Sequence, residues 1–217
     1  EGHFFKPDVV VLINAWNDIA TWTQNGPPLR TVATYRGDPA REYRGVIDEL
    51  LCRHSRLYTA FRGRLLAWLA GVSFHGAPGG EQLDDFSRYG PTQYAANARH
   101  FVSVVRASGA VPLLTVQARA LRPGLPEDKV EPMGLRFLRL QYPAALRAFE
   151  AADAAVRQVG LASAVTVVDL NRAFPSTDGM FTDGIHTTPA GSEVLSRTLA
   201  DALAPIVGRL QAAEAQL

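Results

Sequence analysis

Three short runs of mostly apolar residues constrain the fold of this chain more than any other feature of its sequence. The runs are Val9–Ile13, Val111–Val116 and Val165–Leu170. The first is apolar throughout and rich in β-branched residues, which predicts a strand buried on both faces, as in a parallel sheet. Because helical patterns lie between the strands, the sequence predicts βαβ units with right-handed crossovers and an α/β fold.

Apolar residues also recur at helical spacing. We expect a helix that Pro91 opens and Gly109 closes, and a second helix over about 143–159 that Gly160 ends. Residues 40–70 show the same spacing, with arginines on the opposite face, and predict one long amphipathic helix or two shorter ones. The stretches rich in glycine and proline are predicted to be loop-like, namely 19–39, 71–90 and 118–139.

Length and composition indicate one globular domain, spanning 1–217, with a helical insertion at about 19–90. The net charge of +1, without a basic run, gives no sign of a nucleic-acid partner. A single cysteine, Cys52, excludes an internal disulfide. The sequence has no apolar run long enough for a membrane span and no visible signal peptide, so its cellular location stays open between secreted and cytoplasmic.

The segment Asp178–Gly191 carries the residues best suited to chemistry. Asp183 and His186 stand three residues apart, just before a predicted helix with Thr188 as its N-cap and Pro189 as its first residue. A carboxylate that holds one ring nitrogen of a histidine leaves the other nitrogen free to act as a general base. The alternative is structural: Asp183 caps a turn, and His186 is a surface residue.

A second polar pair, Asn17 and Asp18, follows the first predicted strand. The carboxyl ends of parallel strands meet at one edge of a sheet, where ligands bind in open α/β folds. We therefore expect Asn17 to face the same cleft as Asp183 and His186, although it is far from them in sequence. The alternative for Asn17 is an ordinary turn residue after a strand.

These motifs resemble those of the SGNH (GDSL-type) hydrolase family. Ala15-Trp16-Asn17-Asp18 is similar to the family block Gly-x-Asn-Asp, and Asp183-Gly-Ile-His186 is similar to its block Asp-x-x-His. The resemblance implies a three-layer α/β/α flavodoxin-like fold with strand order 2-1-3-4-5. It also implies that Asn17 donates to an oxyanion, that His186 is the general base and that Asp183 orients it, without metal or cofactor. Asp18 is expected to brace the Asn17 segment.

The chain departs from the family pattern at its front. Ala15 stands where the family has glycine, and the sequence contains neither a Gly-Asp-Ser segment nor the family's Gly block. We therefore expect family strands 1 and 2, with the serine nucleophile, to lie outside this chain. Val9–Ile13 would then be a bare apolar edge strand, covered by a missing segment or by a second chain.

The resemblance implies a serine ester hydrolase that acts on a small ester or on an acylated carbohydrate or lipid. A non-catalytic binding domain that has lost its nucleophile is the alternative. A flavodoxin-like nucleotide binder is disfavoured, because the Gly-rich stretch 71–80 does not follow a predicted strand. His75 and His100 lack the spacing of metal ligands, so we expect no metal site.

Overall fold

The computed structural model describes residues 6–23, 58, 81–174 and 176–215. The chain divides into two units, residues 1–26 with 80–217, and residues 27–79. All helices and strands named below belong to the first unit. The helix predicted within 40–70, Cys52 and His75 lie outside the described residues. One domain with an insertion at about 19–90 therefore stays a prediction.

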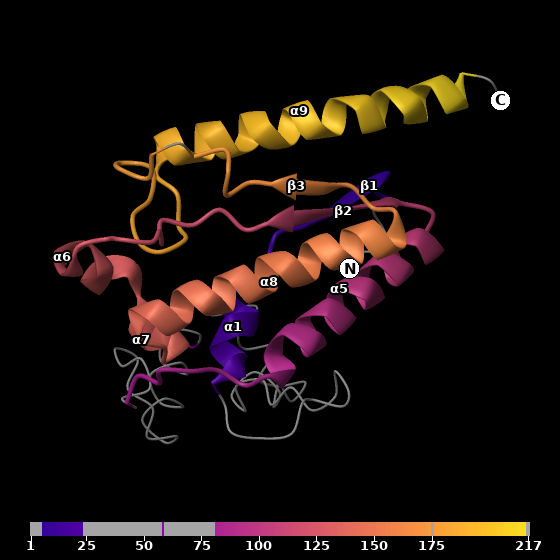
Figure 1. Cartoon of the computed structure of the whole chain (residues 1–217). Coiled ribbons are helices and arrows are strands. Elements are labelled where there is room, and N and C mark those ends of the chain that lie inside the picture. Colours follow the sequence, from indigo (N-terminus) through magenta and orange to yellow (C-terminus); the bar gives the residue numbers. More distant parts are fainter. Residues whose placement is uncertain (1–5, 24–57, 59–80, 175, 216–217) are drawn as a thin grey trace. The chain divides into compact units, whose positions relative to one another are not determined.

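Three parallel strands form a sheet in the order β1-β2-β3 (Figure 1). They are β1 (Val9–Leu12), β2 (Val111–Val116) and β3 (Val167–Asp169). The predicted parallel α/β arrangement is thereby confirmed, while the flavodoxin-like order with two further strands stays a prediction. The third strand is shorter than its apolar run, because the N–H of Val165 binds Gly160 O at 2.8 Å and closes the preceding helix.

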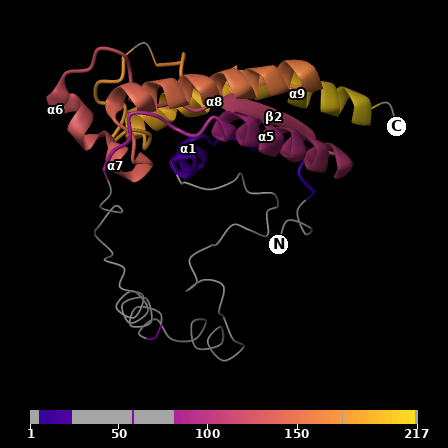
Figure 2. The ribbon, with the colours of Figure 1, turned by 60° about the horizontal axis from the view of Figure 1, so that its bottom comes forward.

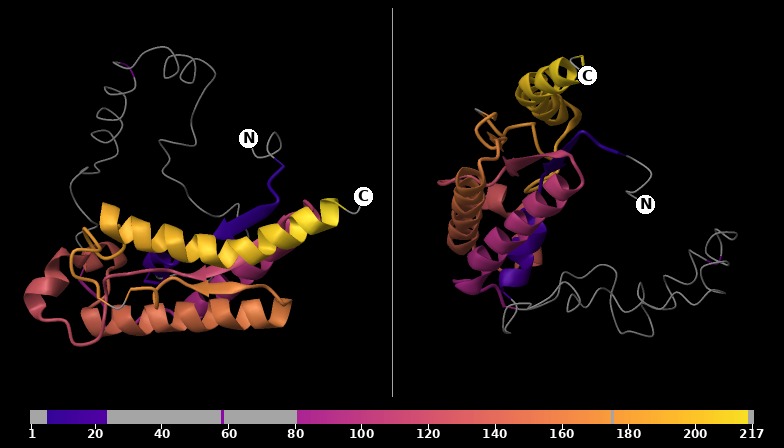
Figure 3. Two further views of the ribbon diagram at one scale, coloured as in Figure 1. Left: turned by 90° about the horizontal axis from the view of Figure 1, so that it is seen from above. Right: turned by 90° about the vertical axis from the view of Figure 1, so that its right-hand side faces the viewer.

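Helices cover both faces of this sheet (Figures 1 and 3). On one face lies α9 (Pro189–Glu214); on the other lie α1 (Trp16–Trp22), α5 (Tyr89–Ala107) and α8 (Tyr142–Ser163). Adjacent residues of β2 serve opposite cores: Leu113 is buried on the α9 side, and Leu114 is buried on the side of α5 and α8. This alternation follows from the two-residue period of a strand and explains why β2 is apolar nearly throughout.

The helices α5 and α8 lie side by side on the same face of the sheet (Figures 1 and 2). The prediction that Gly160 ends the second of them is wrong, since α8 continues to Ser163. A Cβ atom on Gly160 would lie 2.1 Å from Cγ2 of Val167. Glycine is therefore needed here for the close approach of α8 to β3, and the helix ends instead at Ala164, in the left-handed conformation.

All three predicted loops contain helical residues, and in the described part of the loop 71–90 these are residues 89–90, the start of α5. Residues 19–22 belong to α1, because Trp16, Ile19 and Trp22 recur every three residues and are all buried. The segment 118–139 holds three short helices, which are α6 (Glu127–Val130), η2 (Glu131–Met133) and α7 (Leu135–Leu138).

The last helix begins as the sequence predicts. Thr188 is the N-cap of α9, and its Oγ1 accepts a hydrogen bond from Gly191 N at 3.2 Å. The helix then continues past Pro205 to Glu214. In the described part of the chain, no helix combines the length and the apolar character needed to cross a bilayer.

Candidate active site

Asp183 and His186 form a pair on the loop that leads into α9. The Nδ1 atom of His186 lies 2.7 Å from Asp183 Oδ2, and Asp183 Oδ1 accepts hydrogen bonds from the backbone N–H groups of Ile185 and His186, each at 2.8 Å. Burial acts to raise the pKa of the Asp183 carboxyl, but these hydrogen bonds outweigh it and hold the pKa below its usual value. An ionised carboxylate only accepts, so Nδ1 is the donor of this contact, which leaves Nε2 outside the pair.

Backbone hydrogen bonds give the loop around His186 a defined shape. Thr182 N–H donates to His186 O at 2.8 Å, and Thr188 N–H donates to Met180 O at 2.9 Å. A Cβ atom on Gly191 would lie 2.1 Å from Met180 O, so the first turn of α9 packs tightly on the loop. The His186 side chain remains 73% exposed, and its ring is therefore accessible to a substrate rather than enclosed in the core.

Asn17 lies in the first turn of α1 and is exposed, rather than on a loop after the strand. Its neighbours are braced by a polar network: Asn14 Nδ2 donates to Asp18 Oδ2, Asn97 Nδ2 donates to Asp18 Oδ1 at 3.5 Å, and the Tyr94 hydroxyl donates to Asn14 O. Burial raises the pKa of the Asp18 carboxyl, although the hydrogen bonds from Asn97 and Asn14 act in the opposite sense. Asp18 thus has the bracing contacts expected for it.

The chain segments that carry Asn17 and His186 meet at the carboxyl end of the sheet. A Cβ atom on Gly184 would lie 2.9 Å from Cη2 of Trp16, the residue that precedes Asn17. The segment after β2 binds both sides, since Trp16 N–H donates to Gln117 Oε1 at 2.8 Å and Ala120 N–H donates to Gly184 O at 2.9 Å. The structure therefore brings the two predicted motifs into contact through their neighbours.

Several residues of this arrangement could not be identified from the sequence. The sequence places Gln117 between the predicted strand 111–116 and the predicted loop 118–139, and it indicates no role at the site for Ala120, Asn14 or Tyr94. Position was the available signal for Gln117, because it is the first residue after β2, at the edge where the site was expected. No local pattern points to the contact between Tyr94 and Asn14, which lie on different elements.

A cavity of about 400 Å³ lies beside Asp183. Its walls come from 120–133 and from 177–183; Met133 and Phe181 supply apolar surface and Lys129 a positive charge. A larger hollow of about 1020 Å³ is lined by Glu127, Tyr142 and neighbouring residues, but none of the predicted site residues lines it. The smaller cavity is therefore the one that belongs to the candidate site.

The described residues hold no group of three or more His, Cys, Asp or Glu side chains placed to bind a metal ion. His100, one of the two histidines considered as a ligand, lies exposed on α5. Asp183 is engaged by His186 and by two backbone N–H groups.

Comparisons with known proteins give little further guidance. No family model matches the chain, and no curated protein matches it. Among solved structures, it is similar to a protein from Slackia heliotrinireducens that is provisionally described as an SGNH hydrolase, with 23% sequence identity and a TM-score of 0.39. The match covers 70% of this chain and 76% of the other. A likeness at this level decides neither the fold family nor the function.

Proposed function

We propose that the chain contributes the base, the orienting acid and one oxyanion donor to a serine ester hydrolase site of the SGNH type. The observation that carries the proposal is the contact of 2.7 Å between His186 Nδ1 and Asp183 Oδ2, on an exposed loop. Contact of the same loop with Trp16, next to Asn17, adds support. An isolated surface histidine would not require both features together.

In the proposed mechanism, Nε2 of His186 accepts the proton of a serine hydroxyl as its oxygen attacks an ester carbonyl carbon. Asp183 stabilises the imidazolium that forms. The side-chain amide of Asn17 donates a hydrogen bond to the oxyanion, an interaction typically worth ~10²–10³ in rate. His186 then protonates the leaving alcohol, and a water molecule releases the acyl group in the same way.

The nucleophile of this mechanism comes from outside the described residues. None of the serines in the sequence lies in a Gly-Asp-Ser segment. Among the described strands, β1 is an edge that pairs with β2 alone. We propose that a strand from a preceding segment or from a second chain lies beside Val9–Ile13 and brings the serine to the carboxyl end of the sheet.

The proposed substrate is a small ester or an acylated carbohydrate or lipid. The cavity beside Asp183 has room for the acyl or alcohol part of such a molecule, because ligand pockets usually start at about 300 Å³. Its mixed lining, with Met133 and Phe181 near Lys129 and Asp178, suits a group that is apolar with a polar end. No metal or cofactor takes part in the proposed reaction.

Hydrolysis of p-nitrophenyl acetate tests the proposal. The assay uses a longer protein that also contains the residues encoded upstream of Glu1. We expect His186→Ala and Asn17→Ala to lower hydrolysis strongly. His100→Ala, which alters an exposed histidine on α5, is the matched control and should retain wild-type activity. Hydrolysis that is unchanged in His186→Ala would contradict the proposal.

A non-catalytic binding domain on the same scaffold is the second candidate. The absence of a Gly-Asp-Ser segment and the presence of Ala15 in place of glycine favour it. Binding of an ester by the longer protein, without hydrolysis and without an effect of His186→Ala, would support this candidate instead.

A further inference from the structure

The segment that follows β2 binds both halves of the candidate site through a few residues. Gln117 accepts the N–H of Trp16 through its side chain, and Ala120 donates its own N–H to Gly184. Trp16 precedes Asn17, and Gly184 lies between Asp183 and His186. A shift of this segment would therefore move the oxyanion donor and the base relative to each other.

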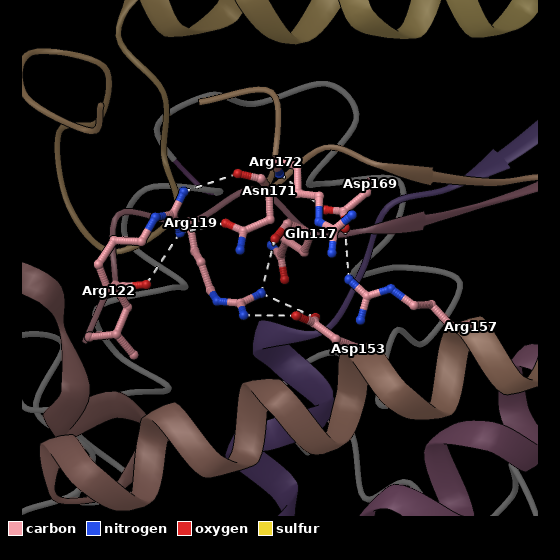
Figure 4. A network of polar contacts seen from close by, with 9 residues as sticks. Gln117, Arg119, Arg122, Asp153, Arg157, Asp169, Asn171 and Arg172 are labelled. Atoms are coloured by element: carbon pink, nitrogen blue, oxygen red, sulfur yellow. Dashed lines mark hydrogen bonds and ion pairs between the residues drawn. The ribbon is translucent and has the colours of Figure 1, made fainter. Parts of the chain in front are cut away.

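Arg119 lies between these two contacts and ties the segment to α8. Its guanidinium forks onto the carboxylate of Asp153, with Nη1 at 3.1 Å from Oδ1 and Nη2 at 2.8 Å from Oδ2 (Figure 4). Nη1 also lies 3.4 Å from Gln117 O. Both side chains are buried, with 7% and 9% of their surfaces exposed, so the pair is shielded from water.

The same arginine also contacts an aromatic ring that packs against Trp16. Its guanidinium carbon lies 4.7 Å from the ring centre of Phe149, and the rings of Phe149 and Trp16 are 5.8 Å apart. Arg119 is thus connected to Trp16 by two routes, one through Gln117 and one through Phe149. The fork fixes the direction of the segment as well as its distance from α8.

Burial of the Arg119–Asp153 ion pair has a cost in desolvation free energy. The Nε atom of Arg119 is buried and finds no hydrogen-bond partner among the described residues. Apolar side chains of similar volume are often equally stable or more stable in such a position. The feature that they lack is the two-bond geometry, which points to a role of the pair in placement.

We propose that Arg119 and Asp153 are positioning residues that hold the segment 117–120 so that Asn17 and His186 face a common substrate. Their catalytic consequence rests on the proposed function, whereas their effect on the segment does not. They touch neither the reacting atoms nor Asp183. Other arginines of the network have different partners: Arg122 binds Asn171, and Arg157 binds Asp169 (Figure 4).

Amide hydrogen exchange of the 217-residue chain tests the positioning. The N–H groups of Trp16 and Ala120 make the two bonds in question, and the N–H of Leu114 in β2 is the internal reference. In the double variant Arg119→Met/Asp153→Leu we expect exchange at Trp16 and Ala120 to rise at least ~10-fold relative to Leu114, since the apolar pair preserves the core but not the fork.

Val156→Ala is the matched control, because Val156 is buried on α8, close to Asp153 in sequence, and makes no polar contact with the segment. It should speed exchange at all three amides alike. Arg119→Lys keeps the charge without the fork and should give a smaller relative rise. If the double variant does not fold, Arg119→Lys decides: a relative rise supports the proposal, and unchanged relative exchange overturns it.

Steady-state kinetics distinguish failure of this proposal from failure of the proposed function. In the longer protein that carries the nucleophile, the double variant should lower kcat about 10-fold with KM nearly unchanged, because misplacement affects the transition state more than substrate binding. If the exchange result holds but the wild type hydrolyses no ester, the function fails and the positioning stands. If esters are hydrolysed but relative exchange is unchanged, the positioning fails and the function stands.

Discussion

The two halves of the candidate site are held in place by different means. Most contacts that hold His186 are local, through Asp183, Thr182 and the capped start of α9, and one hydrogen bond to its loop, from Ala120 N–H to Gly184 O, comes from elsewhere. Asn17 depends on distant parts of the chain, because Trp16 before it lies in the core and Asp18 after it is bound by Asn97 of α5. One half is a local motif, whereas the other is a product of tertiary packing.

The two carboxylates of these halves differ accordingly. Hydrogen bonds to Asp183 outweigh its burial and lower its pKa, whereas burial of Asp18 outweighs its hydrogen bonds and raises its pKa. An exposed local loop thus favours the charged form of its acid, and a packed helix start disfavours it. This difference suggests that mutations should affect the two halves in distinguishable ways.

The largest effect is expected from Asp183→Asn, which alters the local half. An asparagine cannot enforce the tautomer with the proton on Nδ1, and hydrolysis by the longer protein should fall by about 10⁴ in kcat. Steady-state kinetics with p-nitrophenyl acetate measure this. Activity within tenfold of wild type would show that the contact between Asp183 and His186 is not catalytic.

Trp16→Ala should break the tertiary half and leave the local half intact. Removal of this buried ring should lower the free energy of unfolding by about 3–5 kcal/mol, as is usual for large aromatic residues in a core. Urea unfolding measures the loss. In the folded variant, the NMR signals of the His186 ring should still show its hydrogen bond to Asp183. Loss of that hydrogen bond would show that the local half also depends on Trp16.

Asn17→Ala sharpens the comparison, because it removes an exposed side chain without disturbing the core. We expect kcat to fall by about 10²–10³, as for other oxyanion donors. The thermal midpoint should stay within about 2 °C of wild type, since exposed substitutions seldom change stability much. A stability loss as large as that of Trp16→Ala would assign Asn17 a structural role instead.

A smaller loss is expected from Thr188→Ala, which removes the N-cap of α9. The Thr188 hydroxyl accepts from Gly191 N and donates to Gly179 O, so its removal should cost about 1 kcal/mol of stability. Thr188→Ser, which retains the cap, is the control. If both variants unfold alike in urea, the cap does not stabilise the His186 loop.

The opposite pKa shifts of the two carboxyls predict opposite effects on acid stability. The folded pKa of Asp183 is lowered, so its contribution is present above the unfolded pKa of about 3.9 and is lost as pH falls through the folded pKa. The folded pKa of Asp18 is raised, so its contribution favours the folded state at low pH and is lost as pH rises through that pKa.

Unfolding in urea between about pH 3 and pH 7 measures both contributions. With Asp183→Asn, the free energy of unfolding should decrease less as the pH falls. With Asp18→Asn, it should decrease more. Asp201→Asn on the exposed face of α9 is the control and should leave the curve nearly unchanged. Changes of the same sign in the Asp183 and Asp18 variants would contradict the contrast between the two halves.

Local features of the sequence predicted much of this arrangement. The β2 run matches its strand residue for residue, and Thr188 with Pro189 correctly located the start of α9. Each of these follows from interactions between residues close in sequence, or from the burial of one continuous run. The pairing of Asp183 with His186 belongs to the same class, because both lie on one short loop.

Interactions between distant residues could not be predicted in this way. Gly160 has the appearance of a helix end, and only the approach of Val167 shows why it lies within α8. The helical turn at Asn17 depends on burial of Trp16 and Trp22 beneath a sheet that is assembled from other parts of the chain. The two-bond contact of Arg119 with Asp153 likewise cannot be predicted from the sequence, because it forms only when β2 and α8 are packed together.

The sequence by itself determined the parallel α/β character of the chain, the capped last helix and the carboxylate–imidazole motif before it. Only the tertiary structure decided that Trp16 meets Gly184 and that the segment after β2 binds both. The physical reason is the range of the interactions. Hydrogen bonds within a few residues are encoded locally, whereas a contact across the sheet exists only once the core has fixed both elements.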